Sequence, residues 1–285
     1  MLQVFLGDVP LSAVGPREMR RFVIGLRGRR RYQDHPLIKG TGADKPLSDR
    51  TINNRVRGIK ALYYGLAQAE LISENPIQNY RAPKPGDTTP PTLTPEQIKL
   101  LLSQPDLKKP AQLRDWAIMA LLYDSKCRVS ELCRITMCDL EDKSFTVEGK
   151  GGRQLTYIFE SDAARALARY RAVRPEPSPG VADYLFLTHD GRQLTRGRVQ
   201  AIMKIYQKKA GITSRVSPHT FRHSSARDAI RHGTNLEEVR LLLNQRDIKS
   251  TQIYTRLENS DARKAQARYS PLNALGAIPR SKKRR

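Results

Sequence analysis

A histidine and an arginine lie close together in the segment SPHTFRHSSARDAIRHG and have the chemistry to act on a phosphate group. Ser217 suits a helix N-cap and Pro218 the first helical position, so the sequence predicts a helix with His219 in its first turn. Residues three and four apart share a helix face, which places His219, Arg222 and His223 together beside the positive helix end. This arrangement is the outline of a phosphate site.

Tyr254 is a second residue whose chemistry needs an explanation. It stands in the polar and basic run NQRDIKSTQIYTRLEN, which has no obvious apolar stripe. Ser250 suits the cap of a short helix in which Ile253 and Leu257 share the inward face. Tyr254 then lies about 100° around the helix from Ile253 and can project toward a ligand. Because the chain holds eleven tyrosines and most tyrosines serve packing, this hypothesis depends on companion residues.

The composition favours nucleic acid as the partner. A chain of 285 residues with 39% hydrophobic content can form one large or two ordinary domains, so it is not a disordered polycation. Its formal net charge of +23 concentrates polyanions at the surface. An anionic membrane could use the same charge, but no apolar run approaches the roughly 20 residues of a transmembrane helix, and no signal peptide opens the chain. We therefore expect a cytoplasmic protein that does not bind or span a membrane.

The three cysteines are odd in number, closely spaced and without a nearby histidine. They are Cys127, Cys133 and Cys138. Their spacing fits neither a disulfide framework nor a standard zinc site. We interpret them as small core or helix-face residues and expect no bound metal.

The N-terminal part of the chain predicts an amphipathic helix that starts near Pro16. Its narrow apolar stripe consists of Met19, Phe22, Val23 and Leu26. Residues 27–48 follow, and their charge, glycines and prolines are typical of a basic surface loop. The basic side chains of this loop include Arg29, Arg30 and Arg31.

A second helix is predicted in SDRTINNRVRGIKALYYGLAQAELI, which begins with a Ser or Asp cap. Its expected inward face consists of Ile52, Val56, Ile59, Leu62 and Leu66. Its outward basic side chains are Arg55, Arg57 and Lys60. A charged face is often merely solvated, but the net charge favours contact of this face with DNA.

The run NYRAPKPGDTTPPT holds four prolines and no apolar periodicity, so it predicts an extended linker between two domains. A helix restarts after it in TPEQIKLLL. Thr94 is its expected cap, Pro95 its first position and Gln97 the reciprocal capping residue.

A hairpin is predicted in SFTVEGKGGRQLTYIF, where apolar residues alternate on both sides of the turn GKGG. Lys150 lies at the exposed tip of this hairpin, where it can reach an outside ligand. A further strand is expected in DYLFLT, residues 183–188.

Four ordered segments, CRVSEL, GKGG, HTFRH and LLNQRDIKSTQIYT, resemble the motifs of tyrosine recombinases of the phage-integrase and Xer type. The preceding TINNRVRGIKALYYGLAQAELISENPI resembles their helical core-binding domain. The resemblance covers most of residues 10–265, and the order and separation of the four motifs make it specific.

The resemblance implies a role for each of five residues. Tyr254 is the nucleophile, and Arg128 and Arg222 are the arginine pair. His219 is the first histidine, and Lys150 is the hairpin lysine. Two further residues are supporting ones: Glu131, at the acidic position three residues after Arg128, and His223, which shares the face of His219.

Attack on a DNA phosphodiester builds negative charge on the non-bridging oxygens, and two guanidiniums offer planar donors that stay charged, so no metal is needed. A phenol of pKa about 10 needs a base, for which His219 is available. Lys150 can protonate the departing 5′ oxygen. The product implied by the resemblance is a 3′-phosphotyrosyl link, which allows reversal without ATP or any other cofactor.

Three positions depart from the family pattern. Gln245 stands where the family has His or Trp; its amide donates a hydrogen bond but carries no charge. Asn244 replaces a glycine and suits a left-handed helix end. Lys126 replaces the small glycine before the first arginine, where it either touches the DNA backbone or crowds it.

The predicted fold is mainly α within the α+β class, the fold of DNA breaking-rejoining enzymes. A helical, SAM-like core-binding domain spans residues 1–80, and a linker spans residues 81–92. A mixed helical catalytic domain with a small antiparallel sheet spans residues 93–270, and a basic tail spans residues 271–285. The expected partners are double-stranded DNA, clamped between the domains, and further copies of the chain in a tetramer on paired sites.

The expected function is site-specific recombination of duplex DNA. Two alternatives stay open at this point. Gln245 and Lys126 motivate a catalytically weakened DNA-binding relative, and a type IB topoisomerase would use a similar set of residues to nick and close DNA.

Overall fold

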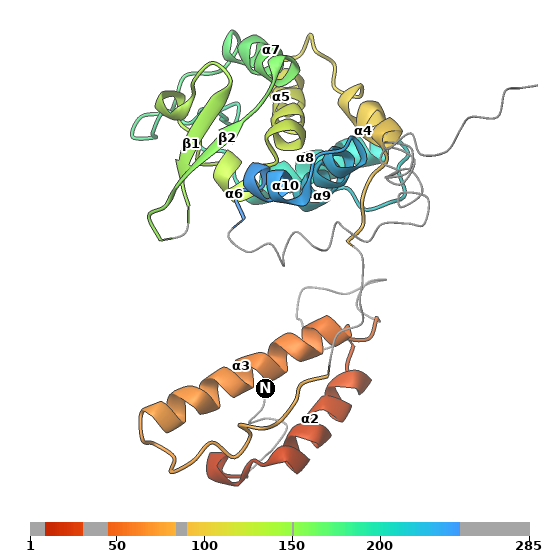
Figure 1. The fold of residues 1–285 in the computed structure, drawn as a ribbon. Coiled ribbons are helices and arrows are strands. Elements are labelled where there is room, and N and C mark those ends of the chain that lie inside the picture. Colours follow the sequence, from red (N-terminus) through yellow and green to blue (C-terminus); the bar gives the residue numbers. More distant parts are fainter. Residues whose placement is uncertain (1–8, 31–44, 84–89, 150, 246–285) are drawn as a thin grey trace, which may run out of the picture. The chain divides into compact units, whose positions relative to one another are not determined.

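The computed structural model describes residues 9–30, 45–83, 90–149 and 151–245 (Figure 1). The chain divides into two compact units, Met1–Thr88 and Thr89–Arg285. The division falls within residues 81–92, the predicted linker.

The first unit is built on α2 (Pro16–Gly28) and α3 (Asp49–Gln68), preceded by the short 3-10 helix η1 (Leu11–Ala13). Proline at the first position starts α2, and the oxygen of Ser48 accepts from the Thr51 N–H across 3.3 Å to cap α3. The apolar stripe predicted for α2 is confirmed, since all four residues are buried: Met19, Phe22, Val23 and Leu26.

The inward face predicted for α3 is wrong at one position. Leu62 is 50% exposed, and its neighbour Tyr63 is fully buried instead. At 3.6 residues per turn Tyr63 falls almost in line with the buried Ile52 and Val56, whereas Leu62 is rotated away from that line. The Tyr63 hydroxyl can be buried because it donates to the carbonyl oxygen of Leu11 across 2.9 Å.

The second unit contains seven α-helices among its described residues. They are α4 (Pro95–Leu102), α5 (Pro110–Ser125), α6 (Val129–Leu132), α7 (Ser161–Arg171), α8 (Arg196–Lys209), α9 (Pro218–Arg231) and α10 (Leu236–Leu242). The predicted capping box of α4 is confirmed, because Thr94 and Gln97 exchange side chain to backbone hydrogen bonds of 3.3 and 3.0 Å. The 3-10 helix η2 (Met137–Asp139) precedes the sheet.

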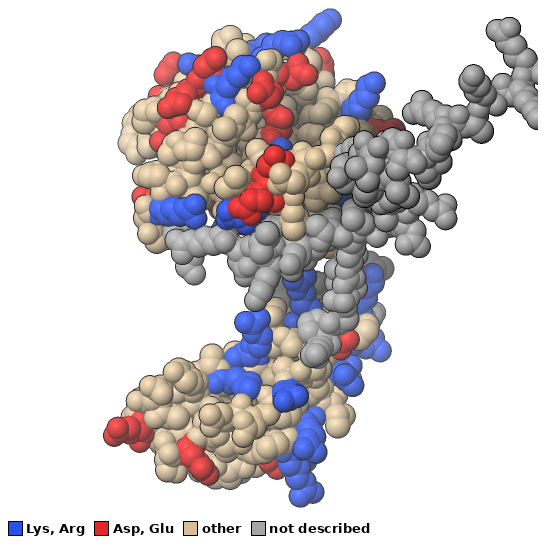
Figure 2. Space-filling model, viewed as in Figure 1, with Lys and Arg blue, Asp and Glu red and all other residues tan. Residues whose placement is uncertain are grey.

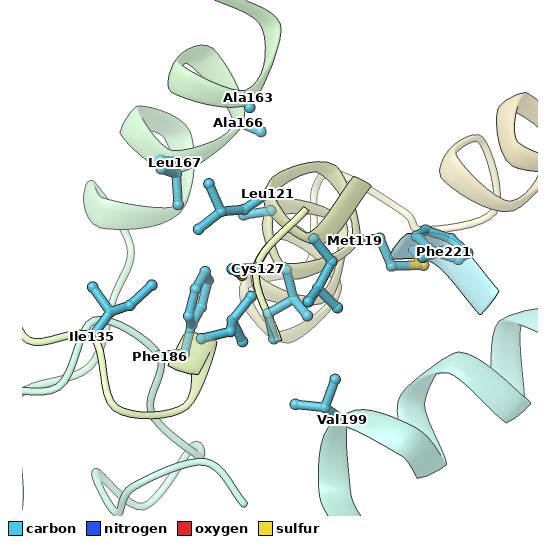
Figure 3. Close-up of a cluster of buried hydrophobic side chains, with 14 of the residues drawn as sticks. Met119, Leu121, Cys127, Ile135, Ala163, Ala166, Leu167, Phe186, Val199 and Phe221 are labelled. Carbon is cyan, nitrogen blue, oxygen red and sulfur yellow. The ribbon is translucent and has the colours of Figure 1, made fainter. Parts of the chain in front are cut away.

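Helix α5 lies at the centre of the core of this unit and packs against α7 and α9 (Figure 1). Buried side chains surround it on several sides (Figure 3). Met119 and Leu121 of α5 lie among Leu167 of α7, Val199 of α8 and Phe221 of α9. This core holds the ends of α5 and α9, which carry candidate site residues, in fixed positions.

The predicted hairpin is confirmed. Strands β1 (Ser144–Glu148) and β2 (Gln154–Ile158) pair antiparallel, and in the described residues they form a sheet of two strands. The pairs Phe145 with Tyr157 and Val147 with Leu155 point into the core. At the tip, Gly151 has a φ of 77°, which suits glycine, and Lys150 lies outside the described residues. A mainly helical fold with a small antiparallel sheet was expected, and the structure has it.

The further strand expected at residues 183–188 does not form and is replaced by isolated bridges. Arginine side chains satisfy three of the carbonyl groups of this segment in place of a neighbouring strand. Arg174 donates to the carbonyl oxygens of Tyr184 and Leu185, and Arg114 donates to that of Leu187 across 3.0 Å.

Candidate active site

Lys126 makes the turn that presents Arg128. Helix α5 ends at Ser125, and Lys126 follows with a φ of 58°, a left-handed conformation that favours glycine. Its ammonium folds back onto its own turn and donates to the carbonyl oxygen of Asp124 across 2.9 Å. Burial lowers the pKa of Lys126, while Asp124 opposes this shift and Arg222 adds to it.

Arg128 is the N-cap of α6 and is held by Glu131. Nη1 of Arg128 lies 2.9 Å from Oε1 of Glu131, and its backbone N–H donates to Oε2 across 2.7 Å. The Glu131 side chain is only 5% exposed, whereas that of Arg128 is 41% exposed. The carboxylate is therefore a buried anchor, and part of the guanidinium stays accessible to a ligand. Burial opposes the charge of Arg128, but Glu131 and Tyr157 hold its pKa above the usual range.

Arg222 lies on α9 and is buried. Its guanidinium donates from Nη1 to the carbonyl oxygen of Lys126, and from Nη2 to that of Leu243 across 2.7 Å. A buried guanidinium needs such partners for its donors. Arg222 thus joins the turn before Arg128 to the end of α10.

His219 lies in the first turn of α9, as predicted, where Ser217 caps the helix by accepting from the Thr220 N–H across 3.1 Å. His219 is exposed at the surface, but partial loss of hydration lowers its pKa, and the positive charges of Arg222, Arg128 and Arg215 lower it further. The positive charges of both guanidiniums therefore favour the neutral form of the His219 ring.

His223 lies one turn along α9 from His219, and the two ring centroids are 6.4 Å apart. Burial lowers the pKa of His223 to about 4, with contributions from His219 and Arg222. The shared face expected for His219, Arg222 and His223 is thus present.

Asn244 and Gln245 follow α10. Asn244 has a φ of 49°, which confirms the left-handed helix end expected there. Its amide donates to the carbonyl oxygen of Thr156 on β2 across 2.8 Å. The carbonyl oxygen of Gln245 accepts from Nη1 of Arg240 across 2.8 Å. These contacts place Gln245 next to the hairpin.

An open cleft of about 1410 Å³ joins several of these residues. That volume exceeds the roughly 300–1,000 Å³ of a small-molecule pocket, so the cleft suits a larger ligand. Its lining includes the predicted Arg128, Glu131 and Gln245, together with both sides of the hairpin tip, Gly149 and Gly151.

Several basic or polar residues line the same cleft but were missed in the sequence. They are Arg134, Arg153, Gln193 and Arg196. Arg153 directly follows the turn GKGG, and Arg196 opens α8 after its cap Thr195, so both positions carried a usable signal. The Tyr157 hydroxyl donates to Glu131 across 2.7 Å. The sequence carried no signal for this role, because the alternation of apolar residues marked Tyr157 as a core residue.

The basic residues predicted to contact DNA from the first unit lie in several settings. Arg57 is exposed, Arg55 is half-buried, and Lys60 donates to the carbonyl oxygens of Gln78 and Tyr80 across 2.9 and 2.8 Å. Arg29 and Arg30 follow the end of α2. Lys and Arg side chains are prominent on the visible face of this unit (Figure 2). Arg31 and Tyr254 lie outside the described residues.

Among the described residues, no group of three or more His, Cys, Asp or Glu side chains lies in position to hold a metal ion.

In the parts of the chain that the structure describes, no helix is both long enough and apolar enough to cross a membrane.

The chain is similar in sequence and in fold to several known proteins. Residues 91–261 match the phage integrase family. The chain is 34% identical over 247 residues to tyrosine recombinase XerC of Bacillus pumilus, which covers 84% of this chain and 81% of that protein. It is 32% identical over 246 residues to XerC of Bacillus subtilis, with the same coverage. Its fold is similar to that of XerH site-specific recombinase bound to a palindromic difH substrate, with a TM-score of 0.73 at 18% identity over 95% of this chain and 76% of that chain.

The chain belongs to the phage integrase family. It is a tyrosine recombinase, an enzyme of site-specific DNA recombination, as its motifs predicted. A catalytically weakened DNA-binding relative and a type IB topoisomerase are not favoured, because the relatives are tyrosine recombinases.

Proposed function

We propose that Tyr254 attacks a phosphodiester of double-stranded DNA that lies against Arg128, Arg222 and His219. The Tyr254 oxygen forms a bond to phosphorus, and the bond from phosphorus to the 5′ oxygen breaks. The protein is then joined to the 3′ phosphate, and a 5′-hydroxyl is released. A 5′-hydroxyl from another strand reverses the step without ATP.

The observation that supports this proposal most strongly is the position of Arg128, which Glu131 holds across 2.9 Å while its side chain stays 41% exposed and lines the open cleft. His219 lies in the first turn of α9, and the charges of Arg222 and Arg128 favour its neutral form. A neutral imidazole can accept the proton of Tyr254. The guanidiniums beside it stabilise the charge that develops on the non-bridging oxygens. Lys150, which lies between β1 and β2 in the sequence, protonates the departing 5′ oxygen.

Gln245 supplies a further hydrogen-bond donor to the same phosphate. Gln245 lines the cleft together with Arg128. Its position is fixed by two contacts: the preceding Asn244 donates to a carbonyl oxygen of β2, and Arg240 donates to the carbonyl oxygen of Gln245 itself. An amide there donates without carrying charge. Glu131 holds Arg128, and His223 supports His219.

We infer that the two compact units have different functions. The first, within residues 1–80, binds DNA through its basic face, including Arg55 and Arg57. The second, within residues 93–270, carries out the cleavage. Recombination of two duplexes requires several active sites, and we infer a tetramer on paired DNA sites.

The test begins with selection of a binding site from a random-sequence duplex library by the full chain. The selected site is then synthesised with a nick beside the scissile phosphate, so that a short fragment diffuses away and traps a covalent adduct. The proposal predicts an adduct, a free 5′-hydroxyl that polynucleotide kinase labels directly, and loss of both in Tyr254→Phe. Tyr64→Phe is the matched control, since Tyr64 is a 64% exposed tyrosine of the first unit. Tight binding without an adduct in the parent chain would contradict the proposal.

A further inference from the structure

Tyr157 brings strand β2 into the candidate active site. Its ring is 1% exposed and stacks on that of Phe145, with ring centroids 5.3 Å apart. Its hydroxyl donates to Oε2 of Glu131 across 2.7 Å. Burial raises the pKa of Tyr157, and the charge of Glu131 raises it further, so the hydroxyl keeps its proton.

The hydrogen bonds of the Glu131 carboxylate hold it in one orientation. Oε2 accepts from the backbone N–H of Arg128 and from Tyr157, each across 2.7 Å. This leaves Oε1 directed at Nη1 of Arg128, 2.9 Å away. If Tyr157 lost its hydroxyl, Oε2 would keep one of its two donors, and the carboxylate could rotate away from the guanidinium.

We infer that Tyr157 is a positioning residue for Arg128 and couples the orientation of this arginine to the hairpin. Tyr157 belongs to β2, the strand that follows Lys150 in the sequence. One hydroxyl therefore links the hairpin to the guanidinium that is proposed to contact the phosphate. This inference rests on the proposed function of Arg128.

A second triad in the same unit provides a matched comparison. The Asp115 carboxylate accepts from Arg114 across 3.0 and 2.8 Å, and from the buried Tyr206 hydroxyl across 3.1 Å. The side chain of Arg114 is 8% exposed, against 41% for Arg128. The two triads share their chemistry, but only in the Arg128 triad is the guanidinium open to a ligand.

The experiment compares Tyr157→Phe with Tyr206→Phe in the full chain, on the selected nicked duplex. Tyr157→Phe keeps the ring and its packing. We expect the single-turnover rate of adduct formation to fall about tenfold, the effect of one hydrogen bond to a charged group, while the Kd for the duplex changes less than about twofold. Tyr206→Phe should leave both values within about twofold of the parent. An unchanged rate in Tyr157→Phe, or equal losses in both variants, would overturn the inference.

Two further readouts separate positioning of Arg128 from a general structural effect. In a chain that already carries Arg128→Lys, adding Tyr157→Phe should lower the rate of adduct formation by less than about twofold, because the guanidinium that Tyr157 orients is absent. Fully additive losses would contradict this. Modification of Arg128 by phenylglyoxal, followed by mass spectrometry, needs no cleavage at all. It should be faster in Tyr157→Phe than in the parent and unchanged in Tyr206→Phe, and equal rates in all three would overturn the inference. If the parent formed no adduct, the proposed function would fail, whereas the modification rates would still test the contact.

Discussion

Nη2 of Arg222 lies 2.7 Å from the carbonyl oxygen of Leu243, the residue directly before Asn244 and Gln245. Nη1 of the same guanidinium donates to the carbonyl oxygen of Lys126. Arg222 therefore fixes the segment that carries Gln245 relative to the turn that presents Arg128. A residue expected to contact phosphate also assembles the site around it.

Replacing Arg222 with Lys should damage both roles, because one ammonium cannot reproduce the planar fork of the guanidinium. We expect the free energy of unfolding to fall by about 1–3 kcal/mol and the cleavage rate to fall at least about a hundredfold. The melting curve and the single-turnover adduct assay measure these effects. Arg227→Lys is the control, since Arg227 lies on the same helix and donates to Thr92 across 2.9 Å. An Arg222→Lys chain as active and stable as this control would refute the account of Arg222.

The left-handed conformation of Lys126 leads to a prediction about stability. Glycine adopts a φ of 58° without strain, whereas alanine keeps the Cβ that opposes it. Lys126→Gly should therefore unfold with a free energy about 1 kcal/mol higher than Lys126→Ala. Trp116, the single tryptophan of the chain, lies on α5 and reports unfolding of the second unit by its fluorescence. Equal stability of the two variants would show that the turn is not strained.

Gln245 should contribute through its amide donor. Gln245→Ala is expected to lower the rate of adduct formation about tenfold to a hundredfold, because one donor to the developing charge is lost. Gln245→His, which restores a donor able to carry charge, should cleave at least as fast as the parent. Gln193→Ala serves as control, since Gln193 lines the same cleft with an amide that donates to the Cys133 carbonyl oxygen across 2.9 Å. Equal effects of the two alanine substitutions would argue against a special role for Gln245.

His223 should make the stability of the second unit fall at acidic pH. Its folded pKa is about 4, whereas a histidine in the unfolded chain titrates near about 6.5. Between these values the unfolded chain binds a proton that the folded chain does not, so stability falls as pH decreases from about 6.5 to about 4.

This decrease in the free energy of unfolding should be smaller in His223→Gln than in the parent. Trp116 fluorescence during denaturation at several pH values measures it. His189→Gln is the control, because His189 is 92% exposed and should leave the pH dependence unchanged. Parallel curves for the parent and His223→Gln would contradict the prediction.

Local chemistry made much of the fold predictable. The start of α9 follows from Ser217 and Pro218, and the hairpin follows from alternation around GKGG. Leu62 was predicted to be buried because it is apolar, whereas its neighbour Tyr63 is amphipathic. Tyr63 is buried instead because its hydroxyl donates to the carbonyl oxygen of Leu11, which is far away in the sequence. Periodicity does not reveal such a partner.

The candidate site was predictable in its residue types but not in its connections. Arg128 and Glu131 are three residues apart, and their contact follows from helix geometry. The contacts of Glu131 with Tyr157 and of Arg222 with Leu243 join separate elements, which depends on tertiary packing. The departure at Lys126 marked a position of special backbone conformation, and its φ explains why glycine suits that place.

The role of Tyr254 is tested most directly by identifying the residue that carries the DNA in the trapped adduct. The nicked duplex is incubated with the full chain, the adduct is digested with protease and nuclease, and the remaining peptide with its nucleotide is sequenced by mass spectrometry. We expect a nucleotide joined through its 3′ phosphate to Tyr254. A nucleotide on any other side chain, or on the 5′ phosphate, would contradict this role of Tyr254.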